Sequence, residues 1–471
     1  MHRLLVSAAH KSSGKTTVTL GLCAALAEAG SVVQPFKKGP DYIDPMWLAR
    51  AAGRPCFNLD PYLMDDAALE HCFVDNARGA HIAIVEGNKG LYDGLALDGS
   101  NSNAALATRL GLPVLLVIDA RGMTRGIAPL ILGYQAFDKA IRIGGVVLNR
   151  VGGGRHEAKL RAVIEHYTDV PVLGAVAEDE RLAVMERHLG LMPCAEVDDA
   201  AARVHEIGRL VGAQVDLGRV RALAASAATG FDAPAAAPAA PRGADLRIAI
   251  ARDRAFGFYY PDDLAALEAA GAELVPIDTL NDTRLPAVDG LFIGGGFPEA
   301  CMAELEANAA LRAALRTAIV GGLPTYAECG GLMFLSRSIT WQGRTAQMVG
   351  AIPGDAVMHT RPQGRGYVHL QETAAMPWAP LAGSGELRGH EFHHSSLENV
   401  DPTVTYAYRV KRGHGIDGRH DGIGVHKLLA SYAHLRSDAG THWAPRFVAY
   451  VRSQRALREA ATTPPSLALQ V

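Results

Sequence analysis

Short apolar runs alternate with longer segments of helical periodicity along the first half of the chain. Apolar positions recur with helical spacing in residues 16–28 and 104–110, which predicts helices there. Strands alternating with helices favour an α/β fold with a mostly parallel, doubly wound sheet. Runs rich in β-branched residues predict the strands of this sheet at 4–8, 32–36, 82–85, 114–118, 145–148 and 172–175.

A stretch rich in alanine and proline interrupts this pattern at residues 226–244. Such a composition has little to pack and predicts an interdomain linker. A second α/β pattern follows, with strands predicted at 246–250, 273–276, 290–293 and 324–327 and further β-type segments after Ala346. We therefore expect one α/β domain at 1–225, a linker at 226–244, a second α/β domain at 245–455 and a C-terminal tail at 456–471.

Composition excludes several classes of partner. The chain has 471 residues, and 46 Lys and Arg against 49 Asp and Glu give a net charge of −3, without the basic character of a nucleic-acid binder. The most apolar run, 112–118, is far shorter than the ~20 residues that cross a bilayer, and the N-terminus leads into a strand rather than a signal peptide. Six cysteines without a C-x-x-C pair indicate a reducing compartment. We expect a cytoplasmic protein that binds neither nucleic acid nor membrane.

A phosphate-binding loop is predicted between the first strand and the first helix. In such loops the backbone N–H groups surround the phosphates, the lysine reaches their outer oxygens and the hydroxyl coordinates Mg²⁺. Ala9 stands where the consensus has its first glycine, but the strand–loop–helix context supports an ATP site. An additional lysine of the partitioning-type ATPases would stand at His10, so Lys11 matches that class poorly. The expected nucleotide-binding residues are Gly14, Lys15, Thr16 and Thr17, with Thr16 also a Mg²⁺ ligand.

Carboxylates follow two of the predicted strands near this loop. Asp41 and Asp44 lie just after the second strand, and Glu86 and Asp93 lie at and after the strand 82–85. Ligands of open parallel sheets gather at the carboxyl ends of strands, where all four should lie. An isolated Asp in a Gly/Pro loop is usually a turn residue, but four carboxylates beside a phosphate loop favour Mg²⁺ and phosphoryl chemistry.

A cysteine nucleophile is predicted in the second domain. Cys329 lies between the strand 324–327 and a helix, flanked by Gly330, in the setting of a nucleophile elbow. A helix N-terminus favours the reactive thiolate. The triplet that includes Gly295 and Gly296 can present backbone N–H groups to an oxyanion, and Gly330 is the third candidate for that hole. The other five cysteines fit buried small hydrophobic residues.

A cysteine nucleophile needs a base, which is usually histidine. His434 ends a short strand-like run and has a modest lead over the group His390, His393 and His394. That group is dense enough to suggest a metal, but no cysteine or carboxylate set completes a zinc spacing.

Together these motifs resemble the cobyrinic acid a,c-diamide synthase family over nearly the whole chain. Phosphate-loop chemistry can convert a carboxylate into an acyl phosphate, and a cysteine that hydrolyses glutamine supplies ammonia. The matching segments include residues 12–17, 35–45, 86–87 with 90–94, 186–191, 294–299, 389–393 and 430–435.

The resemblance implies a dethiobiotin-synthetase-like ATP domain followed by a flavodoxin-like class I glutamine amidotransferase domain. Such an enzyme uses ATP, Mg²⁺ and glutamine to amidate the a and c acetate carboxylates of a tetrapyrrole; a homodimer is compatible with the sequence. Arg436 stands where many class I amidotransferases have a glutamate, which implies a Cys–His pair rather than a triad. The residue roles that the resemblance implies are Mg²⁺ binding for Asp41 and Glu86, substrate and acyl-phosphate placement for Asp41, Asp44 and Asp93, nucleophile for Cys329 and base for His434.

Some positions depart from the common cobyrinate pattern and resemble a branch linked to sulfur metabolism. They include Lys38 and residues 361–366, and they leave open sirohydrochlorin or sirohaem as the substrate. Lys37 and Lys38 are expected to receive the substrate carboxylates. The alternative from another class is a regulatory or partitioning ATPase with a non-catalytic C-terminal module. A stand-alone glutaminase would leave the first domain unexplained.

Overall fold

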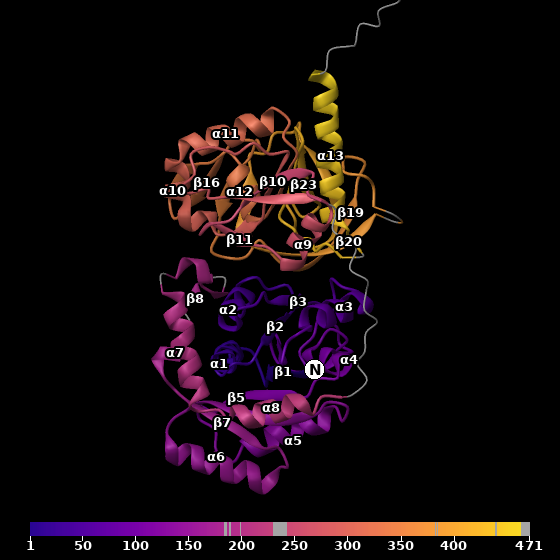
Figure 1. Ribbon diagram of the computed structural model, residues 1–471. Coiled ribbons are helices and arrows are strands. Elements are labelled where there is room, and N and C mark those ends of the chain that lie inside the picture. Colours follow the sequence, from indigo (N-terminus) through magenta and orange to yellow (C-terminus); the bar gives the residue numbers. More distant parts are fainter. Residues whose placement is uncertain are drawn as a thin grey trace, which may run out of the picture. The chain divides into compact units, whose positions relative to one another are not determined.

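The computed structural model describes residues 1–182, 186–187, 190–197, 199–228, 243–381, 383, 385–438 and 440–462 (Figure 1). The chain divides into two compact units, Met1–Ala237 and Pro238–Val471. This division falls inside the segment 226–244 for which a linker is predicted, although residues 229–242 lie outside the described part of the chain.

Seven parallel strands form the sheet of the first unit, in the order β3-β2-β4-β1-β5-β6-β7. The doubly wound parallel sheet predicted from the sequence is confirmed. Strand β3 was not predicted, because three residues are too few to show a pattern. The strands are β1 (His2–Ala8), β2 (Val33–Lys38), β3 (Phe57–Leu59), β4 (Ile82–Glu86), β5 (Val114–Asp119), β6 (Ile143–Val151) and β7 (Val172–Ala177).

Helices connect these strands and cover the sheet. The core that includes Leu5, Val85 and Leu116 on the strands also contains buried apolar residues from the four helices between Asp66 and Tyr167. Two short antiparallel strands, β8 (Glu186–Arg187) and β9 (Gly190–Leu191), follow β7. Residues 188–189, which belong to the matching segment 186–191, lie outside the described part of the chain. The helices are α1 (Lys15–Glu28), α2 (Ile43–Ala52), α3 (Asp66–Ala77), α4 (Asn103–Leu110), α5 (Ile127–Phe137), α6 (Gly154–Tyr167), α7 (Ala200–Gly212) and α8 (Leu217–Ala225).

Small residues let α1 and α7 approach closely. A Cβ atom on Gly208 would lie 2.7 Å from the Cβ of Ala24, and one on Gly212 would lie 2.9 Å from the Cβ of Ala25. Larger side chains at these glycines would push the helices apart. The helix that begins at Lys15 is therefore held by close contact with α7.

Nine strands form the main sheet of the second unit, in the order β12-β10-β13-β15-β24-β23-β22-β19-β20. The first five are parallel to their neighbours and the rest are antiparallel. The strands are β10 (Leu246–Ala251), β12 (Ala272–Ile277), β13 (Gly290–Ile293), β15 (Thr325–Glu328), β19 (Gly364–Glu372), β20 (Glu386–His393), β22 (Thr405–Arg412), β23 (His420–Val425) and β24 (Leu428–Ser431).

In the described part of the second unit, two smaller sheets, five α-helices and a short 3-10 helix at Pro298–Cys301 accompany the main sheet. A two-stranded sheet joins β11 (Phe256–Phe258) to β14 (Gly295–Gly296), and a four-stranded sheet has the order β17-β16-β18-β21. The four strands are β16 (Ser338–Trp341), β17 (Arg344–Gln347), β18 (Asp355–Met358) and β21 (Ser395–Glu398). The helices are α9 (Pro261–Ala269), α10 (Met302–Ala307), α11 (Ala309–Val320), α12 (Gly330–Leu335) and α13 (Trp443–Thr462).

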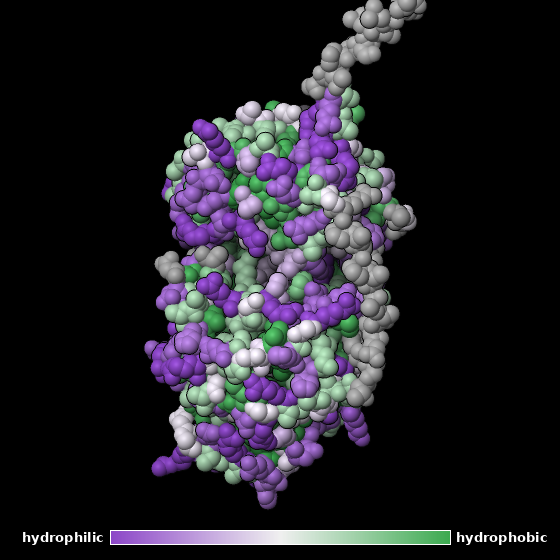
Figure 2. Space-filling view, in the orientation of Figure 1, coloured by the Kyte–Doolittle hydropathy of each residue, from purple (hydrophilic) through white to green (hydrophobic). Residues whose placement is uncertain are grey.

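Helix α13 extends further than the sequence pattern suggested. Its first half packs Trp443, Phe447 and Val451 into the core, and its second half is stabilised on the surface by an Arg455–Glu459 ion pair at 3.4 Å. Its visible surface is largely hydrophilic (Figure 2). Residues 456–462 are therefore helical, and the tail expected from residue 456 was placed too early. In the described residues, no helix combines the length and hydropathy that a membrane crossing requires.

Candidate active sites

The phosphate loop of the first unit lies between β1 and α1, as predicted. Gly14 has a φ of 85°, and Lys15 is the first residue of α1. A Cβ atom on Gly14 would lie 2.0 Å from Nδ2 of Asn149, so only glycine fits this position. Lys15 is buried, which lowers the pKa of its ammonium group.

Two residues of β6 and one of α5 hold this loop, and sequence reasoning missed all three. Asn149 Nδ2 donates to the carbonyl of Ser13 (2.9 Å), and Arg150 Nη1 donates to the carbonyl of Ser12 (3.0 Å). The hydroxyl of Tyr134 donates to the carbonyl of Ala9. Asn149 directly follows the predicted strand 145–148, and that place at a strand's carboxyl end is the signal that could have identified it.

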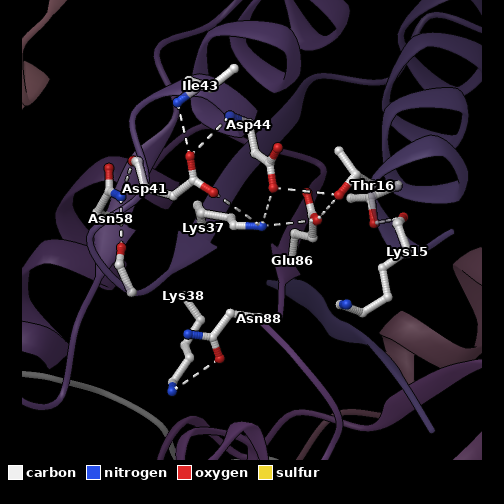
Figure 3. A network of polar contacts seen from close by, with 12 residues as sticks. Lys15, Thr16, Lys37, Lys38, Asp41, Ile43, Asp44, Asn58, Glu86 and Asn88 are labelled. Carbon is white, nitrogen blue, oxygen red and sulfur yellow. Dashed lines mark hydrogen bonds and ion pairs between the residues drawn. The ribbon is translucent and has the colours of Figure 1, made fainter. Parts of the chain in front are cut away.

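Three of the four predicted carboxylates meet around Lys37 (Figure 3). The Lys37 ammonium lies 2.5 Å from Oδ2 of Asp44, 3.0 Å from Oε1 of Glu86 and 3.9 Å from Oδ2 of Asp41. The Thr16 hydroxyl donates to Oε1 of Glu86 (2.6 Å), which links the cluster to α1. The carboxyl ends of β2 and β4 and the start of α2 thus face the phosphate loop.

Burial and charge shift the pKa values in this cluster. Burial, reinforced by the charge of Asp44, raises the pKa of Asp41 to about 7. Burial also raises the pKa of Glu86. For Lys37, burial favours the neutral amine, but the attraction of Asp44 and Glu86 outweighs it and raises the pKa, so Lys37 is a buried cation.

Asp93, the fourth predicted carboxylate, lies in the turn after β4 and does not join the other three. It is exposed, and its Oδ2 accepts a hydrogen bond from the backbone N–H of Gly90 (2.8 Å). Its negative charge raises the pKa of Lys15, although burial and Lys37 have larger effects in the opposite direction. Asp93 therefore lies on the side of the carboxylate cluster that faces Lys15 and the phosphate loop, and its side chain is exposed to solvent.

The expectation that Lys37 and Lys38 receive the substrate carboxylates is wrong. Both ammonium groups are buried and already have partners. Lys38 points away from Lys37 and donates to the Oδ1 atoms of Asn88 (3.2 Å) and Asn101 (3.3 Å) (Figure 3). Burial lowers its pKa to about 8. Lys38 thus connects β2 to the segment that follows β4.

Cys329 of the second unit lies at a sharp turn between β15 and α12. Its φ of 46° and ψ of −100° are strained for a residue other than glycine. The backbone N–H of Cys329 donates to the carbonyl of Ser431 on β24 (2.7 Å), which holds the turn. A Cβ atom on Gly331 would lie 2.3 Å from the carbonyl oxygen of Ile293, so the turn needs small residues next to it.

His434 lies beside Cys329. Strands β15 and β24 pair in parallel, with Glu328 opposite Ser431, and the chain reaches His434 three residues later. Burial favours a neutral ring, but interactions with Cys329 and Glu328 raise the pKa of His434 to about 10. The imidazole is therefore protonated near neutral pH.

The other predicted histidines have different surroundings. The ring of His390 stacks on that of His434, with centroids 4.9 Å apart, and burial lowers the pKa of His390 well below its usual value. Nδ1 of His393 lies 2.8 Å from the carbonyl of Ser395, and Nδ1 of His394 lies 3.2 Å from that of His359. His434 is thus the histidine that the geometry pairs with Cys329.

A carboxylate that the sequence analysis did not anticipate contacts His434. Oε2 of Glu328 lies 3.0 Å from Nδ1 of the ring, whereas Arg436 pairs with Asp262 and lies over the ring of Tyr260. The Cys–His pair therefore has a carboxylate neighbour after all. The sequence did contain a signal for this carboxylate, since Glu328 directly precedes Cys329.

The predicted oxyanion-hole glycines border this site. A Cβ atom on Gly296 would lie 1.9 Å from the carbonyl oxygen of Ala255, and one on Gly330 would lie 2.9 Å from the backbone nitrogen of Gly296. A Cβ atom on Gly295 would lie 2.7 Å from Cε1 of His434. The chain therefore passes close to the cysteine and the histidine only because these residues lack side chains.

We expect Gly295→Ala to reduce glutamine hydrolysis by about 10- to 100-fold, because the added methyl group displaces His434. Steady-state release of glutamate from glutamine measures this loss. The matched control is Gly133→Ala on the surface of α5, where a Cβ atom meets nothing within 4 Å. Equal activity of the two variants would contradict the assignment of His434 as the base that is paired with Cys329.

Within the described residues, no group of three or more His, Cys, Asp or Glu side chains is arranged to enclose a metal ion. This does not argue against Mg²⁺ at the phosphate loop. In phosphoryl-transfer sites Mg²⁺ usually takes one or two carboxylates and completes its shell with water and phosphate oxygens.

Comparisons with known proteins match both units. The CobB/CobQ-like glutamine amidotransferase domain matches residues 247–441, and an AAA domain matches residues 2–186. Several curated relatives carry the name cobyrinate a,c-diamide synthase. The one from Magnetococcus marinus is 47% identical and covers 96% of this chain and 97% of its own length. Those from Methanosarcina acetivorans and Listeria monocytogenes are 42% and 37% identical, over 93% and 92% of this chain and 93% and 96% of their own lengths.

Proposed function

The chain belongs to the cobyrinate a,c-diamide synthase family, and on that premise we propose that it amidates the a and c acetate carboxylates of a tetrapyrrole. It is a carbon–nitrogen ligase that takes its amide nitrogen from glutamine, as the sequence motifs predicted. ATP supplies the phosphoryl group at the loop of the first unit. Cobyrinate or hydrogenobyrinate is the proposed substrate, and sirohydrochlorin or sirohaem is the alternative.

The observation that supports this function best is that one chain contains both halves of the reaction. A phosphate loop faces the cluster of Asp44, Glu86 and Lys37 in the first unit, and a strained cysteine is paired with a histidine in the second. The first arrangement suits activation of a carboxylate by phosphorylation. The second suits release of ammonia from an amide.

We propose that the glutamine half-reaction begins with the thiolate of Cys329. Its Sγ attacks the side-chain amide carbon of glutamine, while N–H groups near Gly295, Gly296 and Gly330 stabilise the oxyanion. His434 gives its proton to the leaving nitrogen, the C–N bond breaks, and ammonia leaves a thioester. His434 then takes a proton from water, which hydrolyses the thioester to glutamate and restores the thiolate.

The ATP half-reaction is assigned to the first unit. The loop N–H groups around Gly14 and the Lys15 ammonium bind and orient the phosphates of ATP. A substrate carboxylate oxygen attacks the γ-phosphorus, which yields ADP and an acyl phosphate. Ammonia then attacks the acyl carbon, phosphate leaves, and an amide remains. Asp41 and Asp44 are the proposed residues for substrate placement, with Asp93 at the exposed side of the site.

The residues present also fit Mg²⁺. Glu86 Oε2 is a buried oxygen without a hydrogen-bond partner among the described residues, and the Thr16 hydroxyl contacts the other oxygen of the same carboxylate. Thr16, Asp41 and Glu86 are the proposed ligands. When bound, Mg²⁺ would neutralise the phosphate charge. The Lys37 ammonium pairs with both of these carboxylates.

Glu86→Gln should raise the Mg²⁺ concentration for half-maximal activity by at least about 10-fold, because it removes a ligand charge. A titration of ammonia-dependent amidation with Mg²⁺ measures this. Glu165→Gln on the exposed surface of α6 is the control. An unchanged Mg²⁺ requirement in Glu86→Gln would remove Glu86 from the proposed ligands.

The substrate is tested by incubating the enzyme with ATP, glutamine and each tetrapyrrole separately. Mass spectrometry then counts the amides, since each replaces a hydroxyl group by an amino group. Two amides on cobyrinate or hydrogenobyrinate would support the proposal, and modification of sirohydrochlorin or sirohaem alone would favour the alternative. A rate of ATP hydrolysis that does not depend on tetrapyrrole or glutamine would contradict the proposed reaction.

A further inference from the structure

We propose that Glu328, the residue directly before the nucleophile, completes a Cys–His–Glu triad with Cys329 and His434. It would be a positioning residue that acts through the imidazole and does not touch glutamine. This inference rests on the proposed function of Cys329. The glutamate two residues after the histidine, which many related enzymes use, is replaced here by Arg436.

The local backbone explains how neighbouring residues can serve one site. In an extended strand, successive side chains point to opposite faces. Tyr326 and Glu328 share the face of β15 that packs toward α13. There the ring of Tyr326 stacks on Phe292 and meets Trp443 and Phe447 at a tilt. At Cys329 the backbone leaves the strand with a φ of 46°, so its side chain departs from this alternation.

The segment after β24 then brings His434 next to the side chains of Glu328 and Cys329. The backbone N–H of Leu435 donates to Oε1 of Glu328 (3.1 Å), and Nδ1 of His434 lies 3.0 Å from Oε2. Because Nδ1 is engaged by the carboxylate, Nε2 is the ring nitrogen available to Cys329. This is the division of roles that a catalytic triad requires.

The contacts of Glu328 stabilise a buried carboxylate. Its side chain is only 3% exposed, and burying an unpaired carboxylate is strongly unfavourable. The Tyr326 hydroxyl donates to Oε1 (2.7 Å), in addition to Leu435 and His434. Burial and the charge of Glu328 raise the pKa of Tyr326 well above its usual value, so its hydroxyl remains a donor.

Other charged or titratable groups near His434 do not replace Glu328. His390 from β20 stacks on the ring, but its lowered pKa leaves it neutral, and the Tyr260 hydroxyl contacts His390 at 3.5 Å. The Arg436 guanidinium pairs with Asp262 at the start of α9. Among the contacts described at the ring, the carboxylate of Glu328 lies at Nδ1. Cys329 is the other group whose interaction raises the pKa of His434.

The decisive variant is Glu328→Gln, which preserves shape but removes the charge. We expect kcat/KM for glutamine hydrolysis to fall by about 100-fold, a usual size for an acid–base contribution. The alkaline limb of its pH profile should move to lower pH by about 1 to 3 units, because the imidazolium loses a neighbouring anion. Amidation supported by free ammonia should keep its wild-type rate.

Three companion variants separate this role from a structural one. Glu328→Asp restores the charge and should return the alkaline limb toward its wild-type position. Tyr326→Phe removes one donor but keeps the carboxylate, so only a small loss in rate is expected. Glu372→Gln removes a buried carboxylate that pairs with Arg446 at 2.7 Å, away from His434, and should leave the pH profile unchanged.

The inference is overturned if Glu328→Gln retains the wild-type rate and alkaline limb while Cys329→Ala is inactive with glutamine. If Cys329→Ala still hydrolyses glutamine, the proposed function itself fails. Should Glu328→Gln not fold, as judged by thermal unfolding, Glu328→Asp decides the question. A reduced rate with an alkaline limb near that of the wild type supports the triad, and a limb displaced to lower pH despite the restored charge overturns it.

Discussion

Cys329→Ala should abolish glutamine-dependent amidation and leave ammonia-dependent amidation intact. In the proposed mechanism Sγ of Cys329 forms the covalent bond to glutamine, and His434 beside it transfers the proton. The expected loss of glutamine hydrolysis is at least about 10⁴-fold, as for removal of a nucleophile in a cooperative catalytic group. Glutamate release and amide formation from free ammonia, measured on the same preparation, separate the two activities.

Cys301→Ala is the matched control for this experiment. Cys301 is also buried in the second unit, in the core that lies against α10 and α12. Its loss should affect stability slightly and leave glutamine hydrolysis unchanged. The role of Cys329 would be rejected if its alanine variant continued to release glutamate at the wild-type rate.

Lys15→Ala should remove ATP-dependent amidation whichever nitrogen source is supplied. We propose that the buried ammonium at the start of α1 reaches the phosphates, and we expect at least about a 10³-fold loss of amide formation. Glutamine hydrolysis, measured alone, should persist because its residues lie in the other unit. The pair of rates therefore shows which half-reaction each unit performs.

Lys159→Ala on the exposed side of α6 controls for the loss of a positive charge. It should not change either activity. If Lys15→Ala formed amide normally from ammonia, ATP would have to be used elsewhere in the chain. If it lost glutamine hydrolysis as well, the two half-reactions would be coupled more tightly than the separate residue sets suggest.

The fold and much of the site followed from local signals. Gly14, Lys15 and Thr16 lie between a strand and a helix, and that placement is visible as a change from strand-like to helical periodicity. The same is true of Cys329 and the glycine after it. Glu86 was located because a strand ends there, and parallel strands bring their carboxyl ends to one edge.

The errors arose where a side chain's partners come from distant segments. Lys37 looks like a substrate-binding cation in sequence, but the fold places Glu86, 49 positions away, beside it, together with Asp44 of its own motif. Glu328 was passed over because the triad acid was sought two residues after His434, where Arg436 stands. Its contact with His434 joins residues 106 positions apart, a separation that no local pattern reports.

The position of β24 has a consequence for how the enzyme is made. This last strand of the second unit lies in the interior of the nine-stranded sheet, next to β15, and the chain must be synthesised past His434 before the sheet can close. The first unit, whose seven-stranded sheet is complete at Ala177, can fold on the ribosome well before that point. A nascent chain can therefore form the phosphate loop before it can bring Cys329 and His434 together.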